Sequence, residues 1–502
     1  MFAKLQRVHF VGIGGIGMSG IAEVLLNLGY KISGSDLRST PVTQRLARLG
    51  AQTFEGHVAE NIHGADVIVT SSAVTADNAE VVEARRLHIP VIQRAEMLAE
   101  LMRLKYGIAI AGMHGKTTTT SMVAAVLAAG GLDPTVVVGG RVDALGSNAR
   151  LGKSQYLVAE ADESDRSFLK LSPILSVVTN IDREHMDCYR NMRDVKQTFL
   201  DFMDRVPFYG MVVACSDDRI LRHLLPLVRR RVITYGTRRD SDFLIQITKP
   251  AKARKSSPAA PPVLSPSHRP LTRFQVRYRD RDLGEFSLHV PGLHNVLNAT
   301  AAIAVGIGLD VPVDQIRQAL DSFQGVDRRF QLRGEVHGVS VIDDYGHHPT
   351  EIKATLAAAR KCGFRRIHVI FQPHRFTRTQ SLLADFTNAF GDADTLCVLD
   401  IYAASEKPIE GVTGESLAGR IAETRVRSIP VRNLPTPEAS PGPPDNREDT
   451  VRYARSFAEA VEIVSALAQP GDMILTLGAG SVSQLGPQIL ERLSTAQSVA
   501  TP

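Results

Sequence analysis

Gly112-Met-His-Gly-Lys-Thr-Thr-Thr-Thr120 is the stretch that decides the fold of this chain. It follows the apolar run Ile108–Ala111, which predicts a short buried strand, and it opens a helical pattern over Thr117–Ala129. A strand, a glycine turn and a Lys-Thr pair at a helix start are typical of a phosphate-binding loop, because backbone N–H groups and the helix dipole attract an anion. Lys116 would add a positive charge and Thr117 a ligand for Mg²⁺. The stretch therefore predicts that the chain binds a nucleoside triphosphate.

Composition limits the class of protein. The 502 residues suffice for roughly three domains, and 44% apolar with 22% charged residues is ordinary for a globular protein in water. The excess of 58 basic over 53 acidic residues is small and tryptophan is absent, so no nucleic-acid surface is expected. Four widely spaced cysteines argue against disulfides and a thiolate zinc site, and no apolar run is long enough for a membrane span. We therefore expect a cytoplasmic protein without membrane insertion.

The first segment predicts a parallel sheet of the Rossmann type. Val8–Val11 and Lys31–Ser33 are typical of strands, with a helix over Met18–Leu28 between them. The turn Gly12-Ile-Gly-Gly-Ile-Gly17 joins the first strand to this helix, and Asp36 follows the second strand, about where an acidic residue meets a ribose hydroxyl. The glycine turn recognises a pyrophosphate rather than a base, so NAD and a UDP-sugar both remain open as its ligand.

The rest of the chain again alternates strands and helices, which predicts an α/β fold with three domains. We expect a Rossmann-like domain over residues 1–105, a central ATP-binding domain of the P-loop ATPase type over 106–327, and a C-terminal Rossmann-like α/β domain over 328–502. Two proline-rich stretches interrupt the pattern, because residues 250–270 predict a disordered insertion and residues 430–446 a flexible one. In the central domain, Gln197–Arg205 is predicted to be a helix.

Two sets of polar residues follow predicted strands of the central domain. Glu160 ends one strand and begins a run of four carboxylates that closes at Asp165, and His185 follows the next strand, Ser176–Thr179, among further carboxylates. Because the carboxyl ends of parallel strands meet at one edge of a sheet, these side chains predict a Mg²⁺ site. His185 would serve there as a metal ligand or an acid–base group. A solvated acidic loop is the alternative for the carboxylates.

Three further clusters carry groups that could bind a nucleotide or another anion. They are the amides of Asn295 and Asn298 at a predicted helix start, the pair Arg328-Arg329 with the acidic pair Asp343-Asp344, and His374-Arg375 with Arg378. Two arginines three residues apart suit a carboxylate or a phosphate, because a guanidinium group binds such anions in a bidentate manner.

In this order, the motifs resemble those of the Mur ligases, the ATP-dependent enzymes that assemble the peptide of bacterial peptidoglycan. The resemblance covers the chain apart from the two proline-rich stretches. It rests on HFVGIGGIGMSGIA, GMHGKTTTT, VAEADESD, VVTNIDREHMD, GLHNVLNATAA, DDYGHHPTEI and HRFTRT. HRFTRT after DDYGHHPTE is the most specific combination, since it separates one kind of Mur ligase from a recycling ligase that attaches a ready-made tripeptide. Arg166 departs from the family pattern, in which a small residue follows ESD.

The resemblance implies a role for each motif. For the UDP-sugar it implies Gly14, Gly15, Ile16, Gly17, Ser35, Asp36, Ser71 and Ser72. For ATP it implies Gly112, Met113, His114, Gly115, Lys116, Thr117, Thr118, Asn295 at the adenine, Arg328 and Asp344. The implied ligands of two Mg²⁺ ions, which Mn²⁺ could replace, are Thr117, Glu160 and His185. The implied catalytic residues are Lys116, His185, His374, Arg375 and Arg378, of which the last three would receive the incoming amino acid.

The resemblance also implies the reaction and its small-molecule partners, which are ATP, UDP-N-acetylmuramate and L-alanine. ATP would activate the sugar's carboxylate as an acyl phosphate, which the amine then attacks to form an amide. A monomer or a homodimer would suffice, with no nucleic acid. Three alternatives stay open: a related ligase that adds another amino acid or a peptide to the same sugar, an NAD-dependent enzyme built on the Gly12–Gly17 turn, and a nucleotide-binding regulator without catalysis.

Overall fold

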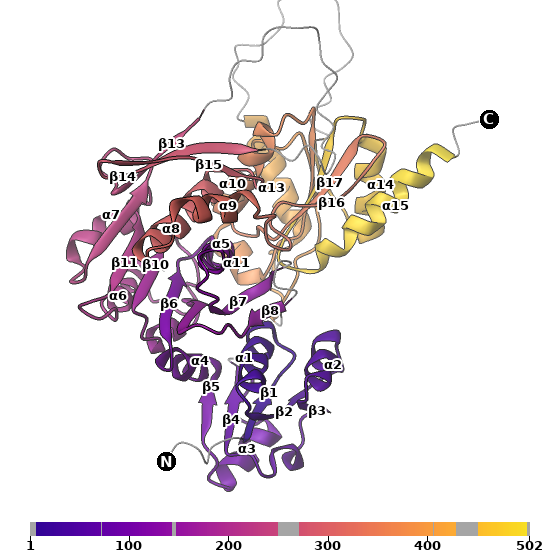
Figure 1. Cartoon of the computed structure of the whole chain (residues 1–502). Coiled ribbons are helices and arrows are strands. Elements are labelled where there is room, and N and C mark those ends of the chain that lie inside the picture. The colour runs from indigo at the N-terminus through magenta and orange to yellow at the C-terminus, as the bar shows by residue number, and fades with distance from the viewer. Residues whose placement is uncertain are drawn as a thin grey trace, which may run out of the picture. The chain divides into compact units, whose positions relative to one another are not determined.

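The chain is an α/β protein built on three sheets, as the sequence predicts (Figure 1). The computed structural model describes residues 7–71, 73–142, 147–248, 271–404, 406–427 and 450–498. The proline-rich stretches predicted at 250–270 and 430–446 lie outside the described residues, as does Ser72. The chain divides into two compact units, of which the first holds two sheets and the second holds the third sheet. Within the described residues, no helix is both long and apolar enough to cross a membrane.

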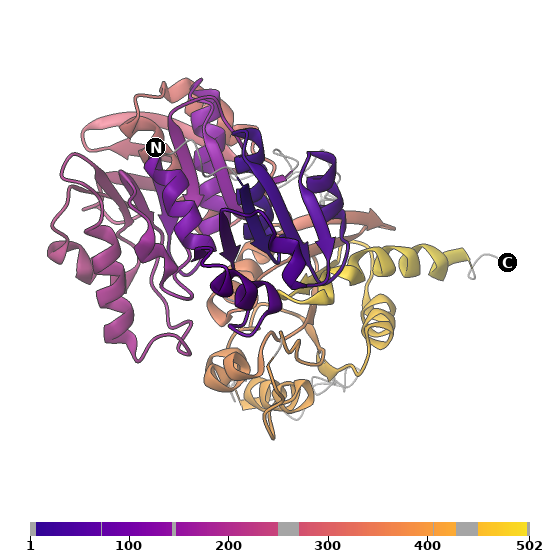
Figure 2. The same ribbon diagram turned by 90° about the horizontal axis from the view of Figure 1, so that it is seen from below.

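The N-terminal sheet has the strand order β3-β2-β1-β4-β5, with every neighbouring pair parallel (indigo to violet in Figures 1 and 2). Its elements are β1 (Arg7–Val11), α1 (Ile16–Asn27), β2 (Lys31–Asp36), α2 (Pro41–Arg48), β3 (Gln52–Glu55), the 3₁₀ turn η2 (Ala59–Ile62), β4 (Val67–Thr70), α3 (Ala79–Arg86), β5 (Val91–Gln93) and α4 (Arg94–Arg103). The strand order reverses at β1, and open parallel sheets bind their ligands at such a switch point. The glycine turn after β1 therefore lies where a nucleotide is expected.

The central sheet has ten strands in the order β15-β14-β13-β12-β11-β10-β6-β9-β7-β8. Its elements are β6 (Tyr106–Ala111), α5 (Lys116–Ala129), β7 (Thr135–Val142), β8 (Ser147–Arg150), β9 (Tyr156–Glu160), η4 (Ser167–Lys170), β10 (Leu175–Val178), α6 (Met192–Met203), β11 (Met211–Cys215), α7 (Arg219–Leu224), η5 (Leu225–Leu227), β12 (Val232–Gly236), β13 (Phe243–Ile247), β14 (Thr272–Tyr278), β15 (Arg281–Leu288), α8 (Leu293–Gly308) and α9 (Val313–Asp321). Both neighbours of β6, which are β9 and β10, run parallel to it. The loops after these three strands therefore begin at the same edge of the sheet.

The C-terminal sheet has the order β16-β17-β21-β18-β19-β20. Its elements are β16 (Gln331–Val336), β17 (Val339–Asp344), α10 (Pro349–Lys361), β18 (Ile367–Phe371), α11 (Phe376–Ser381), α12 (Leu383–Thr387), β19 (Thr395–Val398), α13 (Gly414–Arg427), β20 (Val451–Tyr453), α14 (Phe457–Leu467), β21 (Met473–Leu477), η8 (Ser481–Gln484) and α15 (Leu485–Ser498). β16 pairs antiparallel with β17, and the other neighbouring pairs are parallel.

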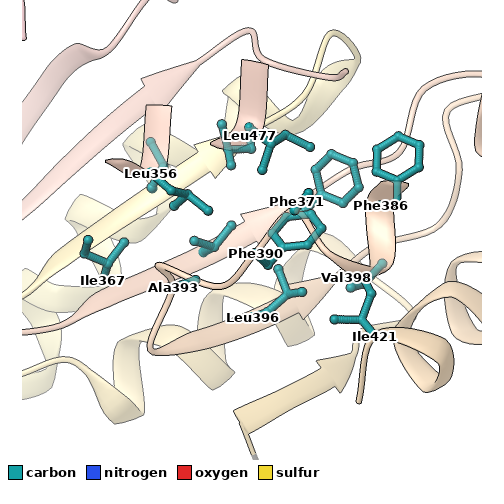
Figure 3. Packing of buried hydrophobic residues seen from close by; sticks show 14 of the residues in the cluster. Leu356, Ile367, Phe371, Phe386, Phe390, Ala393, Leu396, Val398, Ile421 and Leu477 are labelled. Carbon is teal, nitrogen blue, oxygen red and sulfur yellow. The ribbon is translucent and has the colours of Figure 1, made fainter. Parts of the chain in front are cut away.

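One face of the C-terminal sheet is covered by α10, α12 and α13. Leu356, Phe386 and Ile421 from these helices belong to a buried cluster with Phe371 of β18 and Leu477 of β21 (Figure 3). Complete burial of one such side chain contributes ~1.5–3 kcal/mol relative to its exposure to water. The cluster therefore helps to fix β18 and β21, and through Ile342 also β17, in the C-terminal sheet.

The opposite face of the C-terminal sheet is covered by α14 and α15. Val464 and Ile489 from these helices join a second buried cluster with Val341 of β17 and Ile370 of β18. Ile370 and Phe371 belong to different clusters because successive side chains of a strand point to opposite faces. A parallel sheet with helices on both faces needs apolar residues on both sides, which explains why β18 has no polar residue except His368.

A buried carboxylate ties the amino ends of β18 and β21 together. Asp472 is fully buried and accepts hydrogen bonds from Arg365 Nε at 2.9 Å and from Arg366 Nη2 at 3.0 Å. His368 Nε2 donates to the same carboxylate at 3.1 Å, and its Nδ1 lies 2.8 Å from the hydroxyl of Thr395. Burial alone would raise the pKa of Asp472, but these hydrogen bonds outweigh it and lower the pKa to about 2. Burial also lowers the pKa of His368, against the opposing effect of Asp472.

We predict that Asp472→Asn lowers the free energy of unfolding by about 2–4 kcal/mol, because it leaves two arginines without their shared buried counter-charge. The pKa of Asp472 lies below its value in an unfolded chain, so its contribution is present above pH ~4 and is lost as the pH falls towards 2. Chemical denaturation at pH 7 and pH 3 measures both effects. Glu462→Gln is the control, since Glu462 pairs with Arg492 on the surface and should cost less than ~1 kcal/mol. Equal losses in the two variants would contradict the assignment.

Candidate active site

The phosphate loop joins the carboxyl end of β6 to the start of α5. Its two glycines have positive φ angles that other residues rarely adopt, +131° at Gly112 and +83° at Gly115. A Cβ atom at Gly112 would lie 3.1 Å from Asn180 N, and one at Gly115 would lie 2.7 Å from Asn298 Oδ1. Both positions therefore require glycine twice over, for the backbone conformation and for the close approach of a neighbouring segment.

Residues after β10 hold the phosphate loop in shape. Asn180 Oδ1 accepts a hydrogen bond from His114 N at 2.9 Å, while Asn180 Nδ2 donates to His114 O at 2.9 Å. The hydroxyl of Thr179 donates to the same carbonyl at 2.7 Å, and His114 Nε2 lies 3.0 Å from Asp182 Oδ2. A loop that is ordered before a nucleotide arrives loses less conformational entropy when the nucleotide binds.

Lys116 lies inside the loop and makes three hydrogen bonds. Its Nζ donates to Gly112 O at 2.8 Å, to Met113 O at 3.2 Å and to Glu163 Oε1 at 2.7 Å. Glu163 is fully buried, and its Oε1 also lies 3.6 Å from His185 Nε2. The structure therefore brings Lys116, Glu163 and His185 together, although they follow three different strands.

The charge of Glu163 is balanced by Lys116. Burial raises the pKa of Glu163 to about 7, even though the charge of Lys116 acts to lower it. Burial likewise acts to lower the pKa of Lys116, but the neighbouring carboxylates reverse this effect and raise it. Glu163 Oε2 is buried and has no hydrogen-bond partner among the described residues. A buried carboxylate oxygen in that state is unfavourable, so the position would gain from a further cation.

Arg166 and Tyr189 connect the run after β9 with the run that carries His185. The Arg166 guanidinium pairs with Asp194 and lies 4.7 Å from the centre of the Tyr189 ring. The hydroxyl of Tyr189 in turn donates to Glu163 O at 2.6 Å. Arg166, the departure from the family pattern, thus takes part in the contacts that link the run after β9 to the run that carries His185.

The proposed metal ligands lie at one edge of the central sheet. Glu160 ends β9 opposite Ile110 of β6, and Thr117 and the buried Thr118 lie in the first turn of α5, which follows β6. His185 lies beyond β10, on the other side of β6. Carboxylate and hydroxyl oxygens with one imidazole form a donor set that fits Mg²⁺ or Mn²⁺.

The two amides predicted to read adenine lie in the first two turns of α8. Asn295 and Asn298 are both buried, and Asn298 Nδ2 lies 3.5 Å from Asn295 Oδ1. Asn298 lies against Gly115 of the phosphate loop. This contact brings the start of α8 next to the loop within the first unit.

The glycine turn of the N-terminal sheet is held by the two residues that end β2. Gly14 N donates to Asp36 Oδ2 at 2.8 Å, and Gly12 N donates to Ser35 O at 2.8 Å. The Ser35 hydroxyl is buried and donates to Glu80 Oε2 at 2.6 Å. The observed contacts of Ser35 and Asp36 therefore shape the turn itself.

The remaining residues predicted to hold the UDP-sugar lie around the start of α1 and after β4. Gly15 is the N-cap of α1 and offers no side chain to its amides, Ile16 begins the helix, and Gly17 lies against the side chain of Arg94. Ser71 follows β4 and is partly exposed.

A cavity of about 280 Å³ lies within the first unit. Its lining includes Gly17, Arg94, Lys116, Glu160 and Asp162. One space therefore contains a residue predicted to bind the UDP-sugar, a residue predicted to bind ATP and a proposed metal ligand. The rest of its wall is mostly apolar, formed by residues such as Leu98 and Phe168.

In the second unit, Arg328 and Asp344 lie at the carboxyl edge of the C-terminal sheet. Arg328 Nη2 donates to Gly478 O at 2.6 Å, which ties it to the end of β21. Asp344 ends β17 and accepts a hydrogen bond from Phe330 N at 2.8 Å. Burial raises the pKa of Asp344 to about 6, against the opposing charge of Arg329.

The HRFTRT motif begins after β18 at the same edge. Arg378 Nη1 donates to His374 Nδ1 at 3.1 Å, so the proton of a neutral His374 is on Nε2. The His374 ring stacks on Tyr402 with a centroid distance of 5.5 Å, and Arg375 N donates to Tyr402 O at 2.8 Å. Arg375 has a φ of +71°, which is unusual for arginine. The motif is therefore held in one particular conformation.

Three residues of these sites were not singled out by the sequence. Glu80, Arg94 and Tyr189 act through partners 45, 68 and 26 residues away, namely Ser35, Asp162 and Glu163. Contacts over such separations leave no local pattern. Of the three, only Arg94 could have been noticed in the sequence, because a positive charge is unfavourable at the start of a helix and therefore suggests another role.

Three models of Mur ligase domains match the chain. The catalytic-domain model of the Mur ligase family matches residues 7–106, the middle-domain model residues 110–306 and the glutamate ligase domain model residues 328–480. UDP-N-acetylmuramate–L-alanine ligase of Koribacter versatilis is 66% identical over 494 residues, 98% of each chain. The ligase of the same name from Acidobacterium capsulatum is 61% identical over 495 residues, 99% of each chain.

Solved structures show the same fold. The structure of UDP-N-acetylmuramate–alanine ligase from Thermotoga maritima matches with a TM-score of 0.75 and 28% identity, over 98% of this chain and 99% of that one. A murein peptide ligase from Psychrobacter arcticus matches with a TM-score of 0.63 over 97% of this chain, but at 22% identity this likeness concerns the fold alone.

The chain has a phosphate loop in its central sheet, a glycine turn in its N-terminal sheet and an arginine motif in its C-terminal sheet. Together with the matches above, these features identify an ATP-dependent ligase. The chain belongs to the Mur ligase family.

We predict that Gly115→Ala weakens the binding of ATP at least tenfold, because its Cβ would force Asn298 away from the phosphate loop. Gly131→Ala is the matched control, since Gly131 also has a positive φ, +73°, but a Cβ there meets nothing within 4 Å. Both variants should lose ~1 kcal/mol of stability from the backbone strain. Calorimetric titration with ATP and thermal melting separate the two effects, and equal ATP affinity in both variants would contradict the role of Asn298.

Proposed function

We propose that the protein joins the carboxylate of UDP-N-acetylmuramate to the amine of L-alanine in the cytoplasm, as a step in peptidoglycan precursor synthesis. ATP is consumed and yields ADP and phosphate. The names of the relatives at 66% and 61% identity support this substrate pair, since the identity extends over nearly the whole of each chain. An NAD-dependent enzyme would leave Lys116 and the HRFTRT motif without a role. A non-catalytic regulator would not explain why the chain belongs to a family of ligases.

The single observation that carries the proposal is the cavity that Gly17, Lys116 and Glu160 share. A UDP-sugar held by the glycine turn could extend its carboxylate through this space towards Lys116. The carboxylate would then meet the γ-phosphate of an ATP held by the phosphate loop. Proximity of this kind supplies much of the rate of a two-substrate reaction, because the entropy of bringing the groups together is lost on binding.

The chemistry follows from the groups present. A carboxylate is a poor acceptor for an amine, so one carboxylate oxygen first takes the γ-phosphoryl group and ADP leaves. The amine of L-alanine then attacks the acyl carbon, loses a proton and expels phosphate, which leaves an amide. Lys116 would offset the negative charge that develops during phosphoryl transfer. Arg375 and Arg378 would bind the carboxylate of L-alanine, because guanidinium groups suit that anion.

Thr117, Glu160 and His185 would hold the divalent ions, and the buried oxygen of Glu163 supports a need for positive charge at this place. The ions would supply charge neutralisation between two anionic substrates. Glu163 and Tyr189 keep the ligand-bearing loops at a fixed separation.

Product analysis tests the proposal directly. The protein, ATP and UDP-N-acetylmuramate are incubated with L-alanine, with each other amino acid, or with a tripeptide. Mass spectrometry should find the L-alanine adduct and one ADP per amide. A relative at 27% identity over 64% of this chain is named as a ligase for a tripeptide on the same sugar. A tripeptide adduct without an alanine adduct would favour that function.

We predict that Lys116→Ala lowers kcat at least 1,000-fold, roughly the scale for the loss of a key charge at a phosphoryl-transfer site. The affinity for UDP-N-acetylmuramate should stay within twofold, because the glycine turn that holds it belongs to another sheet. Lys153→Ala is the control for the loss of a lysine from the same unit, since Lys153 is exposed. An equal loss of ATP and UDP-sugar affinity in Lys116→Ala would contradict two separate nucleotide sites.

A further prediction concerns His185. His185→Ala should weaken Mn²⁺ binding about tenfold and lower kcat far more than it raises the KM for ATP, because it removes a proposed metal ligand. Electron paramagnetic resonance measures free Mn²⁺, and thermal melting monitors the fold. A lower melting temperature with unchanged Mn²⁺ affinity would show that His185 serves packing only.

A further inference from the structure

Arg94 occupies an unusual position at the start of α4. It is the first residue of this helix, where the helix dipole disfavours a positive charge. The helix already has a capping box, in which Glu96 accepts from Gln93 N at 2.7 Å. Arg94 therefore contributes nothing to the start of its own helix, and its charge needs another explanation.

The side chain of Arg94 lies on the first turn of α1. A Cβ atom at Gly17 would lie 3.1 Å from Arg94 Cδ and 3.2 Å from Arg94 Cζ, so the guanidinium rests directly on the backbone of this glycine. The start of α1 is itself electropositive, since its N-cap Gly15 has no side chain to accept from the first amides and its first turn has no acidic residue. The carboxylate of Asp36 accepts from Gly14 N, one residue before the N-cap. Two electropositive groups are thus packed together beside the glycine turn.

The contact between Arg94 and Asp162 does not account for this arrangement. Arg94 Nη2 lies 3.0 Å from Asp162 Oδ2, and this is the one hydrogen bond that the guanidinium makes to the described residues. The two side chains are 31% and 38% exposed, and an ion pair with that exposure contributes ~1 kcal/mol or less. The other N–H groups of the guanidinium make no hydrogen bond to the described residues.

The cavity places this charge next to the substrate. Arg94 lines the same space as Gly17 and Lys116. The ammonium group of Lys116 is already engaged by Glu163 and by two loop carbonyls. Arg94 is therefore the cation of this cavity that faces the glycine turn, and a guanidinium binds phosphate oxygens in a bidentate manner.

We propose that Arg94 binds the diphosphate of the UDP-sugar together with the amides at the start of α1. An anion at this point is attracted by both electropositive groups, and it removes the repulsion between them. The inference rests on the proposed function, because it names a further residue of the same substrate site. Asp162 then holds the guanidinium in place while the site is empty.

Titration with UDP alone tests this role without catalysis. UDP has the diphosphate but no sugar carboxylate, and the titration is done without Mg²⁺. Arg94→Ala should raise the Kd for UDP at least tenfold, and Arg94→Lys should restore part of the affinity. Arg103→Ala is the matched control on the same helix, since Arg103 is exposed and pairs only with Glu100 among the described residues, and it should change the Kd less than twofold.

Asp162→Asn separates binding from a structural tether. Asparagine can still accept the hydrogen bonds from Ser164 but loses the charge that pairs with Arg94. If Arg94 binds the diphosphate, this variant keeps its UDP affinity within about twofold or binds UDP more tightly. A loss equal to that of Arg94→Ala would show that Arg94 only tethers the loop, and would overturn the inference.

Two further outcomes are decisive. If Arg94→Ala weakens UDP-N-acetylmuramate but not UDP, the arginine binds the sugar or its carboxylate and the diphosphate assignment is wrong. If the unaltered protein binds no UDP at all, the proposed function fails together with this inference. Unchanged UDP affinity in Arg94→Ala, with normal affinity in the unaltered protein, overturns the inference alone. Thermal melting of each variant confirms that the protein titrated is folded.

Discussion

The close approach of the phosphate loop to its neighbours is the constraint on which the rest of the site depends. Asn180 lies so close to Gly112, and Asn298 so close to Gly115, that neither glycine could carry a side chain. Contact at Gly112 requires β10 to lie beside β6, and contact at Gly115 requires α8 to begin at the loop. Once β9 pairs with the other side of β6, the run that carries Glu163 reaches Lys116 as well. The two glycines thus permit this arrangement of three strands and one helix, in which the pairing of β9 and β10 with β6 sets the strand order.

Some of the residues with a strained backbone belong to the candidate sites of the two units. Five non-glycine residues of the candidate sites have φ between +49° and +71°, namely Arg166, His185, Arg328, Phe330 and Arg375. Such a conformation costs a residue other than glycine ~1–2 kcal/mol. Hydrogen bonds that hold the residue in this conformation offset the cost. Phe330 N donates such a bond to Asp344, and Arg375 N donates one to Tyr402 O. Strain of this kind keeps side chains in orientations that a relaxed loop would abandon.

Local patterns predicted the three sheets and the phosphate loop, because each depends on neighbouring residues. The helix predicted at Gln197–Arg205 is α6, which begins earlier, at Met192, since the side chain of Asn191 caps it through the amides of Arg193 and Asp194. That cap was readable from the sequence. The pairing of Lys116 with Glu163 was not, because nothing in a run of four carboxylates tells which one folds inward. The strained φ of Arg375 has no sequence signal either, since tertiary hydrogen bonds impose it.

The ion pair of Lys116 and Glu163 sets a condition on how the site fills. Without a nucleotide, Glu163 is the anion that balances the loop lysine. A phosphate that takes the ammonium group of Lys116 leaves Glu163 buried without its cation, so the carboxylate must then take up a proton or gain another cation. His185 Nε2 lies 3.6 Å from Glu163 Oε1. A divalent ion held by His185 would therefore replace the lost positive charge. On the proposed metal site, nucleotide and metal therefore favour each other's binding, and this coupling is reciprocal because it is a difference in binding free energy. One buried carboxylate thus couples the two ligands, because a nucleotide bound together with its metal leaves Glu163 with a positive charge nearby.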